Sequence, residues 1–285
     1  MLVVGGGFLG TTISDELNFQ QIDNLKTSFT QREAELVYLD IRSKKSIIGC
    51  FEKIKPELVI NCAAMIDIEF LENNPNVAFS TNSDGPKNLA EICDQKKIKM
   101  IQISTDGIFD GKKGMYVESD KPNPINIYAE SKVLGEQFVQ ENLDNHVIIR
   151  TNFYGVNSEE KFLFNWMLNM LKNKKEFSGF DDIIFNPLEI STLSKMIIDV
   201  AKTDFKGILN LSSDEIMSKY EFAKKIANKL NFNENLIKKG SLDDFKFRAG
   251  RPKNTTLNNS KAKQIINFKN ITLGKWLEQI KTLNQ

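Results

Sequence analysis

The fold is decided by Met1-Leu2-Val3-Val4-Gly5-Gly6-Gly7-Phe8-Leu9-Gly10, the first ten residues of the chain. Three apolar residues predict a buried strand, and the residues from Phe8 onward predict a helix, so the glycines form the turn between them. In a GxGxxG turn one glycine permits the tight bend, one lets the backbone approach a pyrophosphate, and one allows close helix–strand packing. The helix start offers free amides and the positive end of its dipole to phosphates. The pattern therefore favours a dinucleotide site over a plain glycine turn, with these residues at the cofactor: Gly5, Gly7, Phe8, Leu9 and Gly10.

Beyond this turn, short β-branched runs alternate with longer amphipathic stretches. We expect strands at Leu2–Val4, Leu25–Ser28, Glu57–Asn61, Met100–Ser104 and Val147–Thr151, and helices at Phe8–Asn18, Lys45–Ile54, Val77–Lys96 and Tyr128–Asn142. Strands that are separated by helices need crossover connections and therefore lie parallel. The pattern predicts an α/β fold in which residues 1–150 form a doubly wound, parallel-sheet Rossmann domain, with ligands at the carboxyl ends of its strands.

The pattern changes after Thr151. A strongly apolar helix is predicted at Lys161–Lys172, followed by short strands at Ile183–Phe185 and Ile208–Leu211 and helices at Thr192–Ala201, Lys219–Leu230 and Leu273–Leu283. We expect residues 151–285 to form mainly a smaller α/β substrate-binding region that caps the Rossmann domain and is interleaved with it.

The composition excludes several classes of protein. The 285 residues are 41% hydrophobic, and 38 Lys and Arg balance 37 Asp and Glu, which gives no bulk attraction to nucleic acid. Three cysteines without CxxC spacing and a single histidine, His146, predict free thiols and neither a metal centre nor a Ser-His-Asp triad. The apolar run Leu2–Val4 near the N-terminus is too short for the hydrophobic core of a signal peptide, and no apolar stretch is long enough to cross a bilayer. We therefore expect a cytoplasmic protein without a membrane partner.

The kind of dinucleotide depends on the residues about 20 positions after the glycines, where a ribose-binding carboxylate is usual. The segment Lys26–Arg32 contains no acid. The Ser28 hydroxyl and the Arg32 guanidinium would instead suit a 2′-phosphate, although Arg32 could equally be solvated. We therefore predict that NADPH is preferred and NADH is possible. Asp40 and Ile41 follow the next short strand and are expected to face the adenine.

A second motif, Tyr128-Ala129-Glu130-Ser131-Lys132, places a phenol and an ammonium on one helix face, because positions i and i+4 are neighbours there. We expect Lys132 to favour the phenolate and lower the pKa of Tyr128 from about 10. Tyr128 could then give its proton to a carbonyl oxygen as a hydride arrives, while Lys132 also holds the nicotinamide ribose. A second YxxxK pair, Tyr220 and Lys224, falls outside the nucleotide-binding half, and Tyr220 is expected to be a packing residue.

A hydroxyl is available where the fourth predicted strand ends. Because side chains alternate along a strand, only one of Ser104 and Thr105 points into the cleft. We favour Thr105 as the residue that hydrogen-bonds the reacting carbonyl. The alternative is that its hydroxyl only caps the strand end.

These segments resemble a known family. Ile103-Ser104-Thr105-Asp106-Gly107-Ile108-Phe109-Asp110-Gly111, followed by Pro122-Asn123-Pro124-Ile125-Asn126-Ile127-Tyr128-Ala129-Glu130-Ser131-Lys132, is similar to the dTDP-4-dehydrorhamnose reductase family of extended short-chain dehydrogenases/reductases. The likeness extends over nearly the whole chain. It implies a catalytic triad of Thr105, Tyr128 and Lys132, cofactor contacts from Cys62, Ala63, Ala64, Asn82 and Lys132, and substrate contacts from Asp106 and Arg251. Two departures concern the sugar: Gly107 replaces the family's tyrosine, and Met65-Ile66-Asp67 replaces its Tyr-Thr-x-Val-Asp pattern.

The function that this resemblance implies is the NAD(P)H-dependent reduction of a nucleotide-linked 4-keto-6-deoxy sugar. The hydride would go to C4, with Tyr128 as the proton donor. One alternative is a nucleotide-sugar epimerase or dehydratase that keeps NAD tightly bound. Another is a non-catalytic regulatory subunit of the methionine adenosyltransferase type. Relatives often pair through the helices at Val77–Lys96 and Tyr128–Asn142, so a homodimer is possible.

Overall fold

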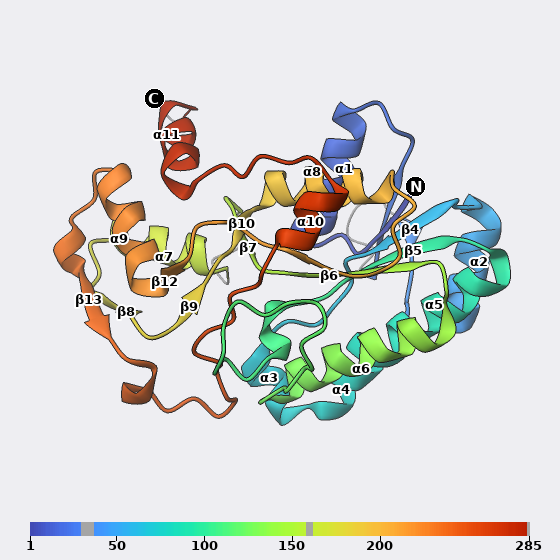
Figure 1. Ribbon diagram of the computed structural model, residues 1–285, viewed down its shortest axis with the longest axis horizontal. Coiled ribbons are helices and arrows are strands. Elements are labelled where there is room, and N and C mark those ends of the chain that lie inside the picture. Colours follow the sequence, from blue (N-terminus) through green and yellow to red (C-terminus); the bar gives the residue numbers. More distant parts are fainter. Residues whose placement is uncertain (30–36, 158–161, 284–285) are drawn as a thin grey trace.

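The computed structural model describes residues 1–29, 37–157 and 162–283, and its centre is a seven-stranded parallel sheet (Figure 1). The strand order is β11-β6-β5-β4-β1-β2-β3. Strands β2 and β3 lie on one side of β1 and the later strands β4, β5, β6 and β11 on the other, so the sheet is doubly wound. The strands are β1 (Leu2–Val4), β2 (Leu25–Ser28), β3 (Val37–Tyr38), β4 (Leu58–Asn61), β5 (Lys99–Ile103), β6 (His146–Thr151) and β11 (Gly207–Leu211). This arrangement confirms the predicted α/β Rossmann-like fold.

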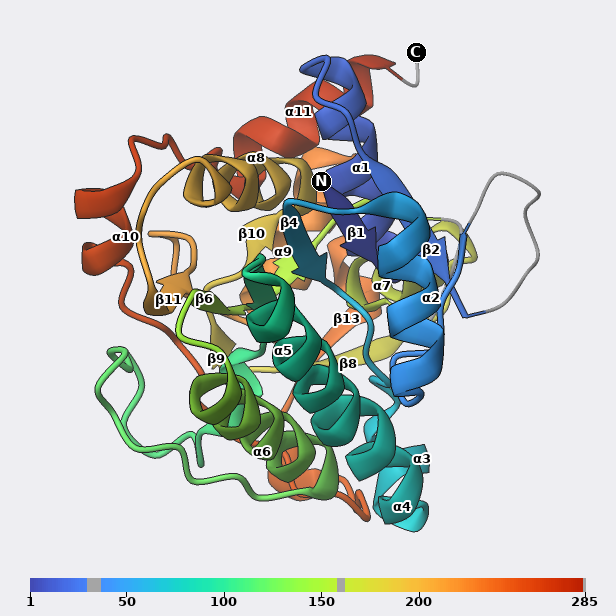
Figure 2. The same cartoon turned by 90° about the vertical axis from the view of Figure 1, so that its right-hand side faces the viewer.

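Helices cover both faces of the sheet (Figures 1 and 2). One face carries α1 (Phe8–Phe19), α8 (Ile190–Ala201) and α10 (Ser260–Ile265), and the other carries α2 (Lys44–Ile54), α5 (Gly85–Lys96) and α6 (Ile127–Asn142). The alternation of side chains in β1 shows why both faces are buried. Val3 packs in the apolar cluster of the first face, whereas Leu2 and Val4 pack in the cluster of the second.

The prediction of one regular helix over Val77–Lys96 is wrong in its middle. The segment consists of α4 (Pro75–Phe79), a π-helical turn at Ser80–Asp84, and α5. Asn82, inside that turn, is only 1% exposed, and its side chain binds the main chain of Met65 and the hydroxyl of Ser131. Because these partners lie outside the helix, they stabilise a wider π-helical turn with one extra residue. The spacing of apolar residues in the sequence does not reveal this distortion.

The second half of the chain divides between the main sheet and a separate lobe, on the left of Figure 1. Strand β11 pairs with β6, and α8 packs on α1, so these elements complete the Rossmann sheet. The lobe contains three helices and paired short strands: α7 (Leu163–Lys172), α9 (Lys219–Lys229), α11 (Leu273–Leu283), β7 (Phe153–Tyr154) with β10 (Leu188–Glu189), β8 (Phe177–Phe180) with β13 (Ile237–Gly240), and β9 (Ile184–Phe185) with β12 (Met217–Ser218).

An aromatic core holds the lobe together. The ring of Tyr154 lies edge-on to Phe222 and Trp276, with centroids 5.3 and 5.1 Å away, and Phe164 lies 5.0 Å from Trp276. Edge-to-face pairs of this kind add to the burial of apolar area. Among the described residues, no helix combines the length and apolar character needed to span a membrane.

Candidate active site

The glycine turn between β1 and α1 has the geometry that a pyrophosphate needs. Gly5 has φ +104°, and a Cβ there would lie 2.8 Å from the amide nitrogen of Ala63. A Cβ on Gly10 would lie 1.9 Å from the carbonyl oxygen of Gly5, whereas a Cβ on Gly7 would meet no described atom within 4 Å. Side chains are therefore excluded at positions 5 and 10 by the fold itself, and position 7 faces open space. Gly7 is the N-cap of α1 and offers no side-chain cap to its first-turn amides, so the site fits a dinucleotide.

The two residues after Gly7 contribute differently. Leu9 is 6% exposed and belongs to the core on the α1 face. Phe8 is half-buried, and its ring centroid lies 6.3 Å from Phe153 and 5.2 Å from Phe162. Only the main chain of Leu9 is therefore available to a ligand.

The residues predicted for the adenosine half lie at the ends of β2 and β3. Ser28 is the last residue of β2, and Arg32 lies outside the described residues. Both carboxylate oxygens of Asp40 accept hydrogen bonds from Arg42 at 2.9 Å, and these bonds hold the pKa of Asp40 below its usual range. The side chain of Ile41 is 5% exposed and packs in the core.

The loop after β4 runs beside the glycine turn. The main-chain N–H of Cys62 donates to the carbonyl oxygen of Val4 at 2.8 Å, and the Ala63 N–H donates to the Asn61 side chain at 3.1 Å. Burial raises the pKa of the Cys62 thiol to about 12, so it stays protonated at neutral pH. Cys62 and Ala63 therefore lie directly against Gly5, and Ala64 follows them in the same loop. Asn82 holds the next residue of this loop, Met65, as described above.

Thr105, Tyr128 and Lys132 come together where β5 and α6 meet. Tyr128 is the second residue of α6, whose N-cap, Asn126, accepts a hydrogen bond from the Ala129 N–H at 2.8 Å. The Thr105 hydroxyl donates to Oδ1 of Asp106 at 3.2 Å and also interacts with the Tyr128 phenol, whose pKa it lowers. Lys132, one helical turn further, donates from Nζ to the carbonyl oxygen of Ile103 at 2.7 Å. The strand end and the helix face thus place a hydroxyl, a phenol and an ammonium in one cluster.

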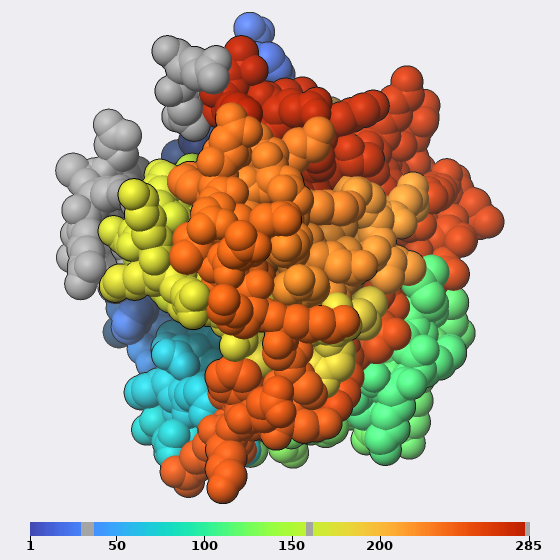
Figure 3. Space-filling model, turned by 90° about the vertical axis from the view of Figure 1, so that its left-hand side faces the viewer, coloured from blue at the N-terminus to red at the C-terminus, as the bar shows by residue number. Residues whose placement is uncertain are grey.

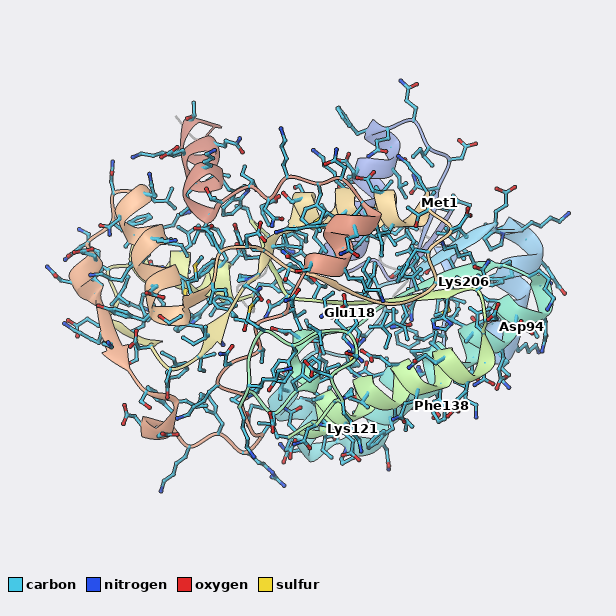
Figure 4. All side chains as sticks on the ribbon, in the orientation of Figure 1. Met1, Asp94, Glu118, Lys121, Phe138 and Lys206 are labelled. Carbon is cyan, nitrogen blue, oxygen red and sulfur yellow. The ribbon has the colours of Figure 1, made fainter. Side chains whose placement is uncertain are left out.

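Ser104 points the other way, as strand alternation requires. Its hydroxyl donates to Oε1 of Glu136 at 2.5 Å. Glu136 also accepts a hydrogen bond from Nη2 of Arg150 at 2.7 Å, and both side chains of this ion pair are at most 3% exposed. Arg150 further donates to the carbonyl oxygen of Glu118, which lies in the middle of the molecule (Figure 4). Thr105, and not Ser104, is the hydroxyl beside Tyr128.

The expected direction of the Tyr128 pKa shift is wrong for this structure. Burial raises the pKa of the phenol to about 12, and the hydrogen bond from Thr105 opposes this only in part. The pKa of Lys132 is itself lowered to about 8 by burial, with Glu136 opposing the shift. Desolvation is the largest cause of both shifts, and the charge of Asp106 raises the pKa of Tyr128 further. Tyr128 is consequently a neutral phenol at pH 7.

The residue after Thr105 is buried in a polar network. Asp106 is 6% exposed, and its Oδ2 accepts hydrogen bonds from Asn152 at 2.9 Å and from Thr255 at 2.6 Å. Burial raises the pKa of this carboxyl, against those hydrogen bonds. A side chain at Gly107 would meet only Thr105 atoms, the nearer at 3.5 Å. Space is thus open where the resemblance would place a tyrosine.

Arg251 is half-buried and pairs with an acidic residue from the first half of the chain. Its Nη2 forms an ion pair with Oε1 of Glu69 at 2.8 Å, and Glu69 belongs to α3 (Ile68–Asn73). In Figure 3 the surface is recessed between the cyan residues of α3 and its neighbours and the orange residues of the C-terminal half. The Arg251–Glu69 ion pair connects the C-terminal half of the chain to α3.

Sequence reasoning missed one charged residue here, Lys219. It is half-buried, and its charge interacts with both Asp106 and Arg251. A lysine at the start of a helix is unremarkable in a lysine-rich chain, so only the folded structure brings it to Asp106. The neighbouring pair Tyr220 and Lys224 lies in the lobe. Tyr220 packs against Gly179, because a Cβ added to Gly179 would lie 2.8 Å from the Cα of Tyr220.

The chain is similar to several proteins that are named as reductases. A probable low-salt glycan biosynthesis reductase, Agl14 of Haloferax volcanii, is 29% identical over 230 residues, which are 79% of this chain and 77% of that protein. The dTDP-4-dehydrorhamnose reductase of Aggregatibacter actinomycetemcomitans is 28% identical over 281 residues, 93% of this chain and 92% of that protein. The crystal structure of the Bacillus anthracis dTDP-4-dehydrorhamnose reductase in complex with NADP superposes with a TM-score of 0.89 at 28% identity, covering 100% of this chain and 99% of the other.

These relatives confirm the predicted class, an NAD(P)-dependent oxidoreductase of the extended short-chain dehydrogenase/reductase type. They also confirm the family resemblance drawn from the segments Ile103–Gly111 and Pro122–Lys132. The profile of the RmlD substrate binding domain family matches residues 1–285, and the chain belongs to that family.

Proposed function

We propose that the protein reduces the keto group at C4 of a nucleotide-linked 4-keto-6-deoxy sugar. The observation that carries this proposal is the cluster of Thr105, Tyr128 and Lys132 at the carboxyl end of β5. A bound nicotinamide cofactor would supply the hydride. The relatives named as dTDP-4-dehydrorhamnose reductases support the choice of a nucleotide sugar.

Tyr128 is the proton donor in this proposal. With a pKa raised to about 12, the phenol is protonated at neutral pH and can give its proton to the carbonyl oxygen as that oxygen gains charge. The Thr105 hydroxyl, which already contacts the phenol, orients the same oxygen. Lys132, whose pKa of about 8 keeps it mostly charged at pH 7, stabilises the phenolate that remains and holds the nicotinamide ribose.

The residues that would hold the cofactor come from the glycine turn, the ends of β2 and β3, the loop after β4 and the π turn at Asn82. Gly5, Gly7 and Gly10, with the main chain of Phe8 and Leu9, would hold the pyrophosphate. Cys62, Ala63, Ala64 and Asn82 would line the nicotinamide side, and Ser28, Asp40 and Ile41 the adenosine side. We favour NADPH over NADH because the end of β2 offers the Ser28 hydroxyl and no carboxylate, and because the crystal structure of one relative is a complex with NADP.

The substrate would lie between Tyr128 and the lobe. Asp106, directly after Thr105, would contact the sugar, and Arg251 would contact a phosphate oxygen. The open space at Gly107 bears on which sugar fits, because a larger ring substituent can be accommodated there. A non-catalytic regulatory role is less favoured, since all three side chains of the predicted triad are present and clustered.

The test is a screen of dTDP-, UDP-, GDP- and CDP-linked 4-keto sugars with NADPH and with NADH, followed by product analysis. We expect one NADPH oxidised for each 4-hydroxy sugar formed with at least one substrate, and a purified protein largely free of cofactor. NAD that copurifies and is recycled without net consumption would point to an epimerase or dehydratase. No cofactor oxidation with any of the sugars would contradict the proposal.

A further inference from the structure

Asn126 connects the helix that carries Tyr128 to the C-terminal half of the chain. Its side chain is 8% exposed, and both ends of its amide are bound. Oδ1 accepts a hydrogen bond from the Ala129 N–H, which caps α6, and Nδ2 donates to the carbonyl oxygen of Gly250, both at 2.8 Å. Gly250 lies 124 residues further along the chain, so the cap of α6 is also a long-range contact.

The two bonds explain why this position holds an asparagine. The Ala129 N–H can only donate and the Gly250 carbonyl oxygen can only accept, so one orientation of the amide satisfies both. Serine and aspartate cap helices about as well as asparagine does, but neither offers an amide N–H at this reach. The side chain of Asn126 therefore does more than cap α6.

The loop that Asn126 contacts, residues 248–251, packs tightly on the first half of the chain. It comes after β13 of the lobe and contains neither a helix nor a strand. A Cβ on Gly250 would lie 2.6 Å from the carbonyl oxygen of Ile125, so the main chain of the loop lies directly on the residues before α6. The Arg248 N–H donates to Oε2 of Glu69 in α3 at 3.3 Å. This loop thus attaches the lobe both to α3 and to the start of α6.

Helix α3 packs beside the start of α6 and holds its first turn from a second direction (Figure 1). Glu72, three residues after Glu69 in α3, accepts a hydrogen bond from the Ile127 N–H at Oε2, at 3.0 Å. Side chains therefore bind the main-chain N–H groups of both Ile127 and Ala129, and Tyr128 lies between them. The main chain of this turn fixes the direction in which the Tyr128 side chain leaves the helix.

We propose that Asn126 is a positioning residue, which ties the first turn of α6 to loop 248–251 and so transmits the position of the lobe to Tyr128. This inference rests on the proposed function for the role of Tyr128 as the proton donor. The proposed substrate lies between Tyr128 and the lobe, so a substrate that draws the lobe inward also acts on this loop. Through Asn126 the same movement brings the phenol into proton-transfer range of the carbonyl oxygen.

The test separates the cap from the link to Gly250. Asn126→Ser keeps a capping oxygen for α6, but its hydroxyl is too short to reach the Gly250 carbonyl oxygen. The matched control is Asn259→Ser. Asn259 is also 8% exposed and also an N-cap, of α10, and its Nδ2 donates to the carbonyl oxygen of Ser212 at 2.9 Å. Because α10 lies on the other face of the sheet, this control removes a similar bond far from Tyr128.

The first measurement is amide hydrogen exchange of the full-length protein with saturating NADPH, which needs no substrate. Asn126→Ser should speed exchange in segments 127–129 and 248–251 by about five- to tenfold, the effect of losing one hydrogen bond that joins them. Asn259→Ser should leave both segments at the wild-type rate. Wild-type exchange of both segments in Asn126→Ser would overturn the proposal.

The second measurement is steady-state kinetics with the best substrate of the sugar screen. Asn126→Ser should lower kcat about 10- to 100-fold, the cost of displacing a reacting group slightly. KM should change less than about threefold, because the lost interaction acts on the proton donor and not on the bound sugar. Asn126→Asp, which keeps the cap and turns the donor into an acceptor, should behave in the same way. A raised KM at unchanged kcat would show that Asn126 only holds the lobe, and the role toward Tyr128 would be wrong.

The outcome is separable from that of the proposed reductase activity. If no 4-keto sugar is reduced and both segments exchange faster in Asn126→Ser, the link between loop and helix stands and the reaction assignment fails. If sugars are reduced and Asn126→Ser keeps the wild-type kcat, the reaction stands and the positioning role fails. Unchanged NADPH affinity and an unchanged unfolding midpoint would show that the variants are folded.

Discussion

The ammonium of Lys132 donates a hydrogen bond to the carbonyl oxygen of Ile103 at 2.7 Å, which ties the middle of α6 to the last residue of β5. Thr105 follows Ile103 by two residues, and Tyr128 precedes Lys132 by one helical turn. This hydrogen bond and the one from Ser104 to Glu136 together hold α6 against the end of β5, which keeps the phenol near the hydroxyl. The bond to Ile103 occupies one of the three donors of the ammonium, so two remain for a cofactor ribose.

Tyr128→Phe should lower kcat by about 10²- to 10⁴-fold, the range expected when a general acid is lost. NADPH affinity should change little, because the phenol hydroxyl is not among the groups proposed to bind the cofactor. Steady-state kinetics and fluorescence titration with NADPH measure the two quantities. Tyr220→Phe, in the second YxxxK pair, is the matched control and should keep full activity. Normal turnover by Tyr128→Phe would remove this residue from the mechanism.

Lys132 should make the stability of the protein depend on pH above neutrality. The folded protein releases the Lys132 proton near pH 8, whereas the unfolded chain keeps it until its ordinary value of 10.5. Between these values the unfolded state binds more protons, so the free energy of unfolding rises with pH across this window. Lys132→Met should reduce that rise. Urea denaturation at pH 7.5, 8.5 and 9.5 measures it, and equal slopes for both proteins would contradict the burial of a charged Lys132.

Features that depend on neighbouring residues were predictable from sequence. The glycine turn, the strand before it and the helix after it follow from local chemistry, and the observed β1 and α1 begin at the predicted residues Leu2 and Phe8. The i, i+4 spacing of Tyr128 and Lys132 likewise fixed their common helix face. Strand alternation separated Thr105 from Ser104 correctly, as the Ser104 contact with Glu136 shows.

Features that depend on tertiary contacts were not predictable in this way. The π turn at Asn82 is stabilised by Met65 and Ser131, which lie 17 and 49 residues away in the chain. The direction of the Tyr128 pKa shift depends on how deeply the surrounding elements bury the phenol. The sequence spacing of Tyr128 and Lys132 gives no information on that burial. Lys219 reaches Asp106 only because β9 pairs with segments on both sides. Each of these is a long-range effect on a residue whose local sequence is ordinary.

Glu136→Gln should destabilise the fold by about 3–5 kcal/mol, because it leaves the buried charge of Arg150 uncompensated. The pair is at most 3% exposed, and its nearest atoms are 2.7 Å apart. Urea or guanidinium denaturation gives the free energy of unfolding. Asp144→Asn breaks an exposed pair with Lys206 and serves as the control, with no measurable change expected. A Glu136→Gln protein as stable as wild type would show that this network adds nothing to stability.

Substitutions in the glycine turn can separate its effect on the stability of the protein from its effect on cofactor binding. Gly10→Ala should cost about 1–3 kcal/mol of stability and also weaken NADPH, because its Cβ would lie 1.9 Å from the Gly5 carbonyl oxygen and force the turn to shift. Gly7→Ala should leave stability unchanged, since its φ of −73° suits alanine and no described atom lies within 4 Å of the new Cβ. That methyl group would occupy the side from which a pyrophosphate approaches, so NADPH binding should still fall at least tenfold. Thermal unfolding and NADPH titration of both variants measure the two effects, and full NADPH affinity in Gly7→Ala would place the pyrophosphate elsewhere.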